Sequence, residues 1–300
     1  MKQIDLQNPF GAPVYFKKTV SSTMDECRKL VAGRKLVAGR RLAAGNEVYG
    51  APSGSVICAD FQRSGRGRNK RPWKTKKGES LMFTLFLEYP DFNTIPKALT
   101  LKTGLAAAKA IEELVPAFKD LIKIKWPNDL MLFSKKISGI LAETEVLPAI
   151  PNKEQGCARV FIGIGINIFQ KHFPKDLQYK AGSLFSIFKD KFPDNEVPSF
   201  FFAKDARVQL LEKILLFLYK EFSSEFSSQK PKKSELSWQK QLEKRLYRQG
   251  EQVKFVQGEA DSGELVFGSL DGIGEEGELL IILHGETEPK PFINGELKVY

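Results

Sequence analysis

The stretch that decides the fold of this chain is ARVFIGIGINIF, residues 158–169. Branched apolar residues occupy every second position, a period that predicts a buried β-strand. The other face of this strand carries Gly163, Gly165 and Asn167, which leave a shallow trough beside the backbone. Glycine inside a strand marks the close approach of a ligand or of a packed element. The strand by itself leaves open whether a ligand or a helix lies against the two glycines.

Segments on both sides of this stretch predict a framework of strands and helices. Runs of apolar and β-branched residues indicate strands at 14–19, 56–61, 81–89, 122–126, 129–133 and 137–145. Helical spacing of apolar residues predicts helices over 97–118 and 203–222, and a last one around Trp238. A further helix is expected to begin at Thr23, because Thr23 and Glu26 fit a capping box.

The sequence predicts two domains, residues 1–247 and residues 248–300. A length of 300 residues is typical of about two domains. After Gly250 the pattern changes to short strands with glycine-rich turns, as in a small all-β barrel or sandwich. The spacing Gly272-x-Gly274-x-x-Gly277 matches a dinucleotide fingerprint, but a strand follows it instead of a helix. We therefore interpret these glycines as hairpin turns.

An internal duplication follows the helix expected at Thr23. KLVAGR occurs at 29–34 and again at 35–40, and RLAAG follows at 41–45. Its glycines recur every six residues, which fits neither a heptad nor a known solenoid repeat. We interpret it as an insertion, a lengthened helix or a loop, and assign it no function.

Composition excludes several classes of protein. No apolar run approaches the roughly 18 residues of a membrane span, and the start of the chain lacks the pattern of a signal peptide. The 3 cysteines have no C-x-x-C spacing, which argues against a disulfide framework or a zinc ribbon and fits a reducing cytoplasm. With 2 histidines, a His-based triad or a multi-His metal site is disfavoured. Chemistry must then rely on Lys, Arg, Asp, backbone amides or the substrate.

The chain is basic, with 46 Lys and Arg against 36 Asp and Glu, a formal net charge of +10. Such a charge attracts phosphates, nucleic acids, acidic proteins or anionic lipid, and it also fits a merely solvated lysine surface. Net charge does not decide among these, so the placement of the basic residues matters more.

A glycine- and arginine-rich loop, SGRGRNKR at 64–71, connects two of the expected strands. Glycine lets the backbone bend toward a ligand, and guanidinium groups bind phosphate or carboxylate bidentately. The loop is not a P-loop. It could also be a disordered RNA-binding segment or a solvated loop, but strong strands flank it and Trp73 closes it.

A tight turn, KWPND at 125–129, joins two further strands. Asp129 opens an otherwise apolar strand and needs a partner, because an unpaired buried carboxylate is costly. Lys136 begins the strand that leads to Gly139. Alternatively, Asn128 and Asp129 only stabilise a hairpin, and Lys136 is a solvent-facing turn lysine.

Taken together and in this order, these motifs resemble those of the biotin protein ligases. The matching residues are Ser22-Thr23, Gln62-x-x-Gly65-Arg66-Gly67-Arg68 with Trp73, Lys125 to Asp129, Lys136-x-x-Gly139, and Gly163-x-Gly165-x-Asn167. The resemblance implies an α+β fold, a mixed β-sheet with flanking helices as in class II tRNA synthetases and lipoate ligases. It also implies that residues 248–300 form a small SH3-like β-barrel.

The resemblance also implies a role for each matching residue. For biotin these are Ser22, Thr23, Gln62, Gly65, Arg66, Lys136 and Gly139. For ATP and the adenylate they are Arg68, Trp73, Asn128, Gly163, Gly165 and Asn167. The residues expected to act in catalysis are Arg66, Arg68, Lys136 and Asp129, with Asp129 near the acceptor lysine or Mg²⁺. No protein ligands for a metal are predicted.

The implied enzyme is an ATP-dependent, AMP-forming ligase. It makes biotinyl-5′-AMP from biotin and ATP and transfers biotin to a lysine of the biotin carboxyl carrier protein of a carboxylase, such as acetyl-CoA carboxylase. Its substrates are ATP and biotin, with Mg²⁺. The resemblance is to the monofunctional ligases, so we expect a cytoplasmic protein that binds neither DNA nor membrane and that could form a homodimer.

The residue inventory fits that chemistry, because the biotin carboxylate is itself the nucleophile toward the α-phosphate. Arginine, lysine and Mg²⁺ can stabilise the charge of the transition state. Two alternatives remain: a lipoate or octanoate ligase, which needs an apolar acyl tunnel, and a non-catalytic RNA-binding module. The polar Ser22, Thr23 and Gln62 oppose the first alternative, and neither alternative explains KWPND together with GIGIN.

Overall fold

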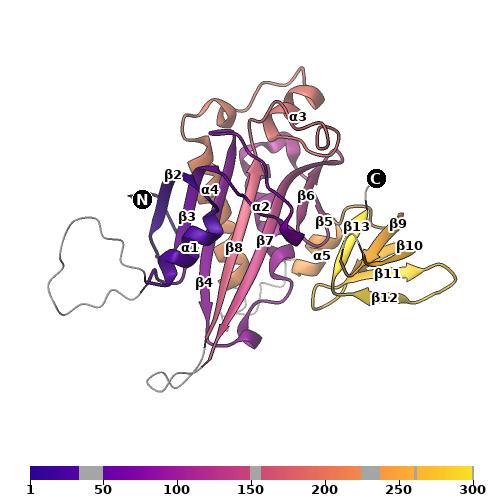
Figure 1. Ribbon diagram of the computed structural model, residues 1–300. Coiled ribbons are helices and arrows are strands. Elements are labelled where there is room, and N and C mark those ends of the chain that lie inside the picture. The colour runs from indigo at the N-terminus through magenta and orange to yellow at the C-terminus, as the bar shows by residue number, and fades with distance from the viewer. Residues whose placement is uncertain (34–49, 149–156, 224–236, 260–261, 299–300) are drawn as a thin grey trace.

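The structure is a computed structural model that describes residues 1–33, 50–148, 157–223, 237–259 and 262–298 (Figure 1). Most of the KLVAGR duplication, from residue 34 onward, lies outside the described residues. Its interpretation as an insertion therefore stays a prediction. Within the described residues, no helix is long and apolar enough to cross a membrane.

A mixed sheet forms the body of the molecule. In spatial order its strands are β1 (Lys2–Ile4), β2 (Val14–Val20), β3 (Val56–Gln62), β4 (Ser80–Tyr89), β8 (Cys157–Asn167), β7 (Lys135–Leu147), β6 (Asp129–Leu132) and β5 (Lys123–Lys125). β2 and β3 run parallel, whereas β4, β8 and β7 are antiparallel neighbours. β4 is buried along nearly its whole length, as its apolar residues on both faces predict.

Helices cover both faces of this sheet (Figure 1). On one face lies α1 (Thr23–Val31), whose Met24 and Cys27 pack with Phe86 and Phe161. The other face packs into the main core with α2 (Leu99–Leu114) and α4 (Ala206–Ser223). The remaining helices are α3 (Leu184–Lys191) and α5 (Trp238–Glu243), with short 3₁₀ turns at Arg68–Lys70, Phe92–Thr94, Pro116–Phe118 and Ser199–Phe202.

The C-terminal part of the chain forms a separate antiparallel sheet. Its strands, in spatial order, are β12 (Pro289–Phe292), β11 (Leu279–Leu283), β10 (Glu264–Ile273), β9 (Gln252–Gln257) and β13 (Gly295–Lys298). The glycines from Gly272 to Gly277 lie at the β10–β11 turn, as expected of a hairpin. This sheet fits the SH3-like domain that we expected, and the division at residue 247 stays a prediction.

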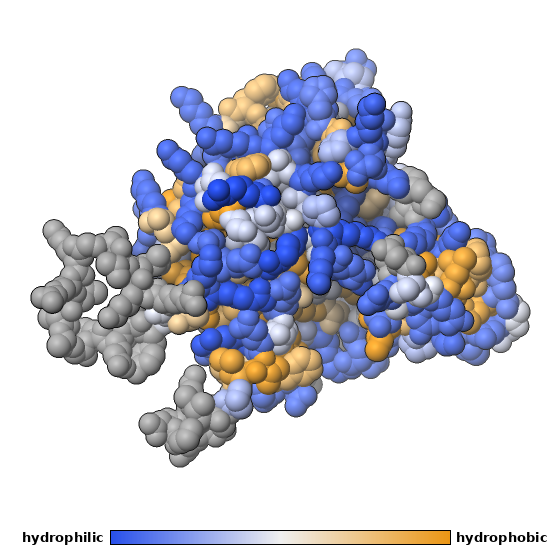
Figure 2. Space-filling view, in the orientation of Figure 1, coloured by the Kyte–Doolittle hydropathy of each residue, from blue (hydrophilic) through white to orange (hydrophobic). Residues whose placement is uncertain are grey.

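The small sheet is docked against the large one. Trp126 donates from Nε1 to the Gly277 carbonyl at 3.0 Å, and its ring lies 5.8 Å from that of Phe255. Figure 2 shows that the visible face of the molecule is mostly hydrophilic, with hydrophobic patches on the small sheet. The docking places the small sheet beside the turn that carries Trp126.

The start of α1 differs in detail from the sequence prediction. The helix begins at Thr23 as expected, but the capping box is wrong, because Ser22 is the N-cap and no side chain caps the helix. The Thr23 hydroxyl instead donates to Gln62, and Glu26 pairs with Lys17. A tertiary partner has replaced the local one, and this contact shapes the site described next.

Candidate active site

A cleft brings most of the predicted site residues together. It lies between α1, the loop after β3, and the β6–β7 hairpin. The predicted residues that line it are Ser22, Thr23, Gln62, Arg66, Arg68, Trp73, Asn128, Asp129, Lys136, Gly139, Gly163 and Gly165. Residues far apart in the sequence thus share one site because β3, β4, β8 and β7 are successive neighbours in the sheet.

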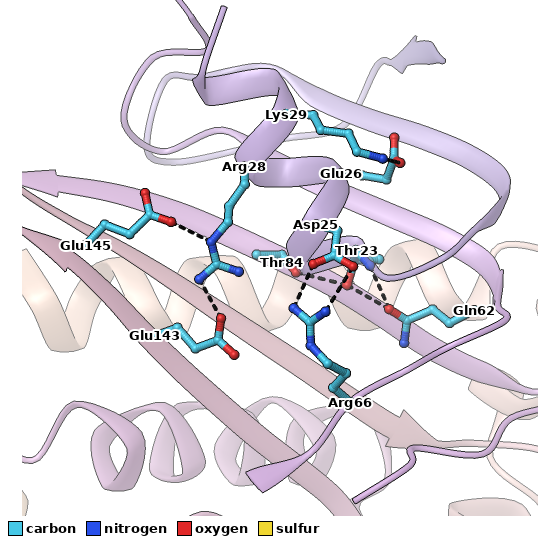
Figure 3. Close-up of polar contacts among 10 residues, drawn as sticks. All are labelled: Thr23, Asp25, Glu26, Arg28, Lys29, Gln62, Arg66, Thr84, Glu143 and Glu145. Carbon is cyan, nitrogen blue, oxygen red and sulfur yellow. Dashed lines mark hydrogen bonds and ion pairs between the residues drawn. The ribbon is translucent and has the colours of Figure 1, made fainter. Parts of the chain in front are cut away.

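A buried chain of polar side chains forms the wall of the cleft at α1. The Gln62 side-chain oxygen accepts hydrogen bonds from the Thr23 backbone amide at 2.7 Å and from the Thr23 hydroxyl at 3.1 Å. Thr84 of β4 in turn donates to the Thr23 hydroxyl at 2.9 Å (Figure 3). Because buried polar groups need partners, this chain fixes the first turn of α1 against β3 and β4.

Glycines of β7 and β8 form the floor. Gly139 and Gly165 are directly opposite each other in the two strands. A Cβ on Gly165 would lie 2.6 Å from the Trp73 ring, and one on Gly139 would lie 3.1 Å from it. A Cβ on Gly163 would instead lie 3.0 Å from the Met24 sulfur of α1. A helix therefore packs on Gly163, which is one of the two alternatives left open by the sequence. The cleft also extends over Gly163 and Gly165, and a ligand there stays a prediction.

Trp73 closes the cleft from the loop side. Its indole lies on the glycine floor, and the Lys136 ammonium lies 5.7 Å from the ring centroid. The indole Nε1 is buried and has no hydrogen-bond partner among the described residues. An unpaired buried donor is costly, so a ligand oxygen that accepts from this group would remove that cost.

Each of the arginines of the loop is held by another part of the chain. Arg66 makes a bidentate ion pair with Asp25 of α1, at 3.0 and 2.7 Å (Figure 3). Arg68 donates to the Gly295 carbonyl at 3.2 Å. Arg71 forms a second bidentate pair, with Glu296 at 2.8 and 2.7 Å. The loop is thus tied to α1 on one side and to the small sheet on the other.

The β6–β7 hairpin supplies the opposite wall. Asp129, whose side chain is mostly buried, has the expected partner, because the Lys136 ammonium lies 2.6 Å from its carboxylate. The side chain of Asn128 donates to the Ile140 carbonyl at 2.7 Å and holds the turn to β7. Lys136 is therefore a cleft lysine and not only a solvent-facing turn residue.

The electrostatics of the cleft come from burial and from these pairs. Burial lowers the pKa of Lys125, although Asp129 and Glu296 oppose that shift. Burial likewise lowers the pKa of Arg68. The hydrogen bond from Arg71 lowers the pKa of Glu296 to about 2. The cleft therefore holds several cations at close quarters, and the pKa of the Glu296 carboxylate beside them is lowered.

Two predicted residues, Gly65 and Asn167, lie outside the lining. A Cβ on Gly65 would lie 2.7 Å from the Trp73 carbonyl oxygen, so glycine permits the close approach of the two loop arms. The Asn167 amide donates to the Gly182 carbonyl at 3.1 Å, and the residue is 4% exposed. In this fold both residues support the walls of the cleft.

Other lining residues were not predicted as site residues. Arg71, Lys125 and Glu296 are the charged ones. Lys125 belongs to the KWPND motif, so its burial beside Asp129 was a signal that sequence could have given. Glu296 lies 131 or more positions from every other residue that lines the cleft, and nothing local marks it.

The carboxylates of the cleft do not fit a protein-held Mg²⁺. No group of three or more His, Cys, Asp or Glu side chains able to hold a metal occurs among the described residues. Asp129 faces Lys136, and Glu296 faces Arg71. Magnesium is usually held by one or two carboxylates together with substrate phosphates. We therefore derive no step through a metal.

Comparisons with known proteins find biotin ligases among the proteins that are similar to this chain. Residues 41–167 match the profile of the biotin/lipoate A/B protein ligase family. The chain is 38% identical over 138 residues to the bifunctional ligase/repressor BirA of Bacillus subtilis (strain 168), which covers 45% of this chain and 39% of that protein. It is 29% identical over 135 residues to the biotin–[acetyl-CoA-carboxylase] ligase of Mycobacterium tuberculosis, covering 45% and 46%. The matches thus span less than half of these curated relatives.

The fold has a counterpart among solved structures. The biotin protein ligase from Aquifex aeolicus, in complex with biotin and ATP, superposes with a TM-score of 0.64 at 24% identity. The match covers 95% of this chain and 97% of that one. The predicted architecture, a mixed sheet with flanking helices and a small SH3-like C-terminal sheet, is confirmed.

The first prediction concerns the floor. In Gly165→Ala the new methyl group would lie 2.6 Å from the Trp73 ring, whereas carbon atoms rest at about 3.5–4.0 Å. We expect the indole to retreat by about 1 Å and its accessibility to rise, measured by acrylamide quenching of tryptophan fluorescence. Gly272→Ala, with no atom within 4 Å of the new methyl, is the control. Equal quenching in the two variants would contradict the packing described.

The second prediction concerns pH. The pKa of Glu296 falls from 4.5 to about 2 in the fold, so its stabilisation is complete above pH 4.5 and is lost as the pH falls toward 2. Glu296→Gln should lower stability at pH 7 by about 2 kcal/mol, discounted because Arg71 is partly exposed. Thermal unfolding should show this difference shrinking below pH 4.5. Glu286→Gln, at an exposed position in the turn between β11 and β12, should show no such trend.

Proposed function

Since residues 41–167 match the profile of the biotin/lipoate A/B protein ligase family, we propose that the chain is a biotin protein ligase. It activates biotin with ATP to biotinyl-5′-AMP and then transfers biotin to a lysine of a biotin carboxyl carrier domain. The observation that carries this proposal is the convergence of Arg66, Arg68 and Lys136 on one glycine-floored cleft. Such a cleft suits a carboxylate and a phosphate that must be brought together.

In the first step, a biotin carboxylate oxygen attacks the α-phosphorus of ATP and pyrophosphate leaves. Two anions approach each other and more charge collects on the phosphate in the transition state, so fixed cations lower the barrier. Arg66 and Lys136 face the carboxylate and the α-phosphate in this proposal, and Arg68 lies near the phosphates. No protein nucleophile is needed, which fits a described lining without cysteine or histidine.

In the second step, the amine of the carrier lysine attacks the carbonyl carbon of the mixed anhydride and AMP leaves. The amine must lose a proton, and a carboxylate in a desolvated site can take it. We assign this part to Asp129, which lies beside Lys136 at the cleft wall. Trp73 and the loop keep water away from the adenylate between the two steps.

The polar wall favours biotin over a lipoyl or octanoyl substrate. The chain formed by Thr84, Thr23 and Gln62 offers hydrogen-bonding groups at the end of the cleft where a ureido ring would lie. The Gln62 Nε2 donates to the Met82 sulfur, a weak acceptor, at 3.5 Å, and a ureido oxygen would offer it a stronger acceptor that an acyl tail lacks. The RNA-binding alternative does not explain why the KWPND turn and the glycines of β8 line one cleft together with the arginine loop.

Several finer assignments belong to the same proposal. The carrier is the biotin domain of a carboxylase, consistent with the printed name of the Mycobacterium tuberculosis relative. Mg²⁺ accompanies ATP as part of the nucleotide substrate, as is usual for phosphates. A cytoplasmic location and a homodimer stay predictions from the sequence.

The test is biotin-dependent exchange of labelled pyrophosphate into ATP. Lys136→Ala and Arg66→Ala should each lower the exchange rate at least about a hundredfold, because each removes a cation that stabilises the transition state. Lys135 directly precedes Lys136 in β7 but lies outside the cleft lining, so Lys135→Ala should retain the exchange rate. Exchange that depends on lipoate instead of biotin, or normal exchange in both cleft variants, would refute the assignment.

A further inference from the structure

A single carboxylate links α1 to the arginine loop. The Asp25 side chain accepts two hydrogen bonds from Arg66, to Oδ2 at 3.0 Å and to Oδ1 at 2.7 Å. Both side chains are about one-third exposed, Arg66 at 36% and Asp25 at 31%. Figure 3 shows the pair bridging the N-terminal turn of α1 and the loop. Asp25 itself is not in the lining of the cleft, whereas Arg66 is.

The helix that carries Asp25, α1, is held to the sheet at both of its ends. The first turn of α1 is fixed by the hydrogen bonds from Thr23 to Gln62. The last turn is held by Arg28, which pairs with Glu143 and Glu145 of β7 (Figure 3). The carboxylate of Asp25 also lies in the first turn, where the helix dipole favours a negative charge. Asp25 is therefore a fixed acceptor at the rim of the cleft.

The loop that Asp25 holds is a small hairpin, and Arg66 and Trp73 lie on its opposite arms. The Trp73 amide donates to the Gly65 carbonyl at 2.8 Å, and the Gly67 amide donates to the Arg71 carbonyl at 2.8 Å. Arg66 pairs with Pro72 across the two arms. Fixing the Arg66 side chain to α1 thus also fixes the arm that carries the Trp73 indole over Gly165.

The geometry of the pair leaves Arg66 able to bind a second anion. A guanidinium has five N–H donors, and Asp25 takes one from each of the two terminal nitrogens. The Nε–H edge is not used by this pair. Arg66 can therefore stay on Asp25 while its remaining donors face a substrate carboxylate or phosphate.

We propose that Asp25 is the positioning residue of Arg66, which fixes its guanidinium and the closed loop 65–73 over the cleft. This inference rests on the proposed function for its kinetic consequences. Without the Asp25 charge the closed loop is less populated, and the apparent affinity for substrate falls by the same fraction. Asp25→Asn keeps the shape of the side chain but offers one oxygen acceptor, and its amide NH₂ faces a guanidinium donor.

The kinetic test uses a double-mutant cycle in the pyrophosphate exchange assay. Asp25→Asn should lower kcat/KM for biotin about fivefold, mainly through KM, as expected for a partly exposed bidentate pair. In an Arg66→Ala background the same change should have no further effect, because Asp25 acts through Arg66. Asp25→Glu, which keeps the charge, should restore most of the loss.

A matched control separates this role from a general loosening of α1. Glu26 is the next residue of α1 after Asp25. Glu26→Gln removes its ion pairs with Lys17 and Lys29 and should leave KM for biotin unchanged. Effects of Asp25→Asn and Arg66→Ala that simply add would overturn the inference, as would wild-type kinetics in Asp25→Asn.

A second measurement does not depend on the reaction. Trypsin should cut the ligand-free loop after the basic residues of 66–71 faster in Asp25→Asn than in the wild type or in Glu26→Gln, with the fragments identified by mass spectrometry. Absence of biotin-dependent exchange in the wild type would refute the proposed function, whereas equal cleavage of all three proteins would refute the role of Asp25. The two failures are therefore distinguishable.

Discussion

The constraint on which the site depends is the absence of side chains along one face of two paired strands. Gly139 of β7 and Gly165 of β8 lie opposite each other, and Gly163 lies two residues before Gly165 on the same face of β8. Without Cβ atoms the sheet admits Met24 of α1 at one end and the Trp73 indole at the other. Any larger residue would need to displace one of these groups, because packed atoms leave no spare room.

The cations of the cleft are paired with carboxylates from separate parts of the chain. Arg66 pairs with Asp25 of α1, Lys136 pairs with Asp129 of β6, and Arg71 pairs with Glu296 of the small sheet. These pairs prevent the cations from repelling one another before an anionic substrate arrives. They also hold the loop at a defined place, which lowers the entropy that binding must remove. The same pairs that stabilise the fold therefore prepare the site for anions.

Much of this arrangement was predictable from the sequence. The alternation in residues 158–169 predicted β8 and placed its glycines on one face, and burial of Asp129 predicted that it needs a partner. The motifs GRGR and KWPND marked the loop and the hairpin that form two walls of the cleft. The capping box at Thr23 was wrong because a helix N-terminus can take a tertiary partner, here Gln62, in place of a local one.

The sequence alone determined which elements form and which residue types carry the charge, since period, turn chemistry and composition are local properties of the chain. Only the tertiary structure decided the partners. The pairing of Arg66 with Asp25 and of Arg71 with Glu296 depends on contacts between elements that the sequence does not place beside each other. The physical reason is that ion pairs and packing act through space over a few ångströms, so separation along the chain does not predict them.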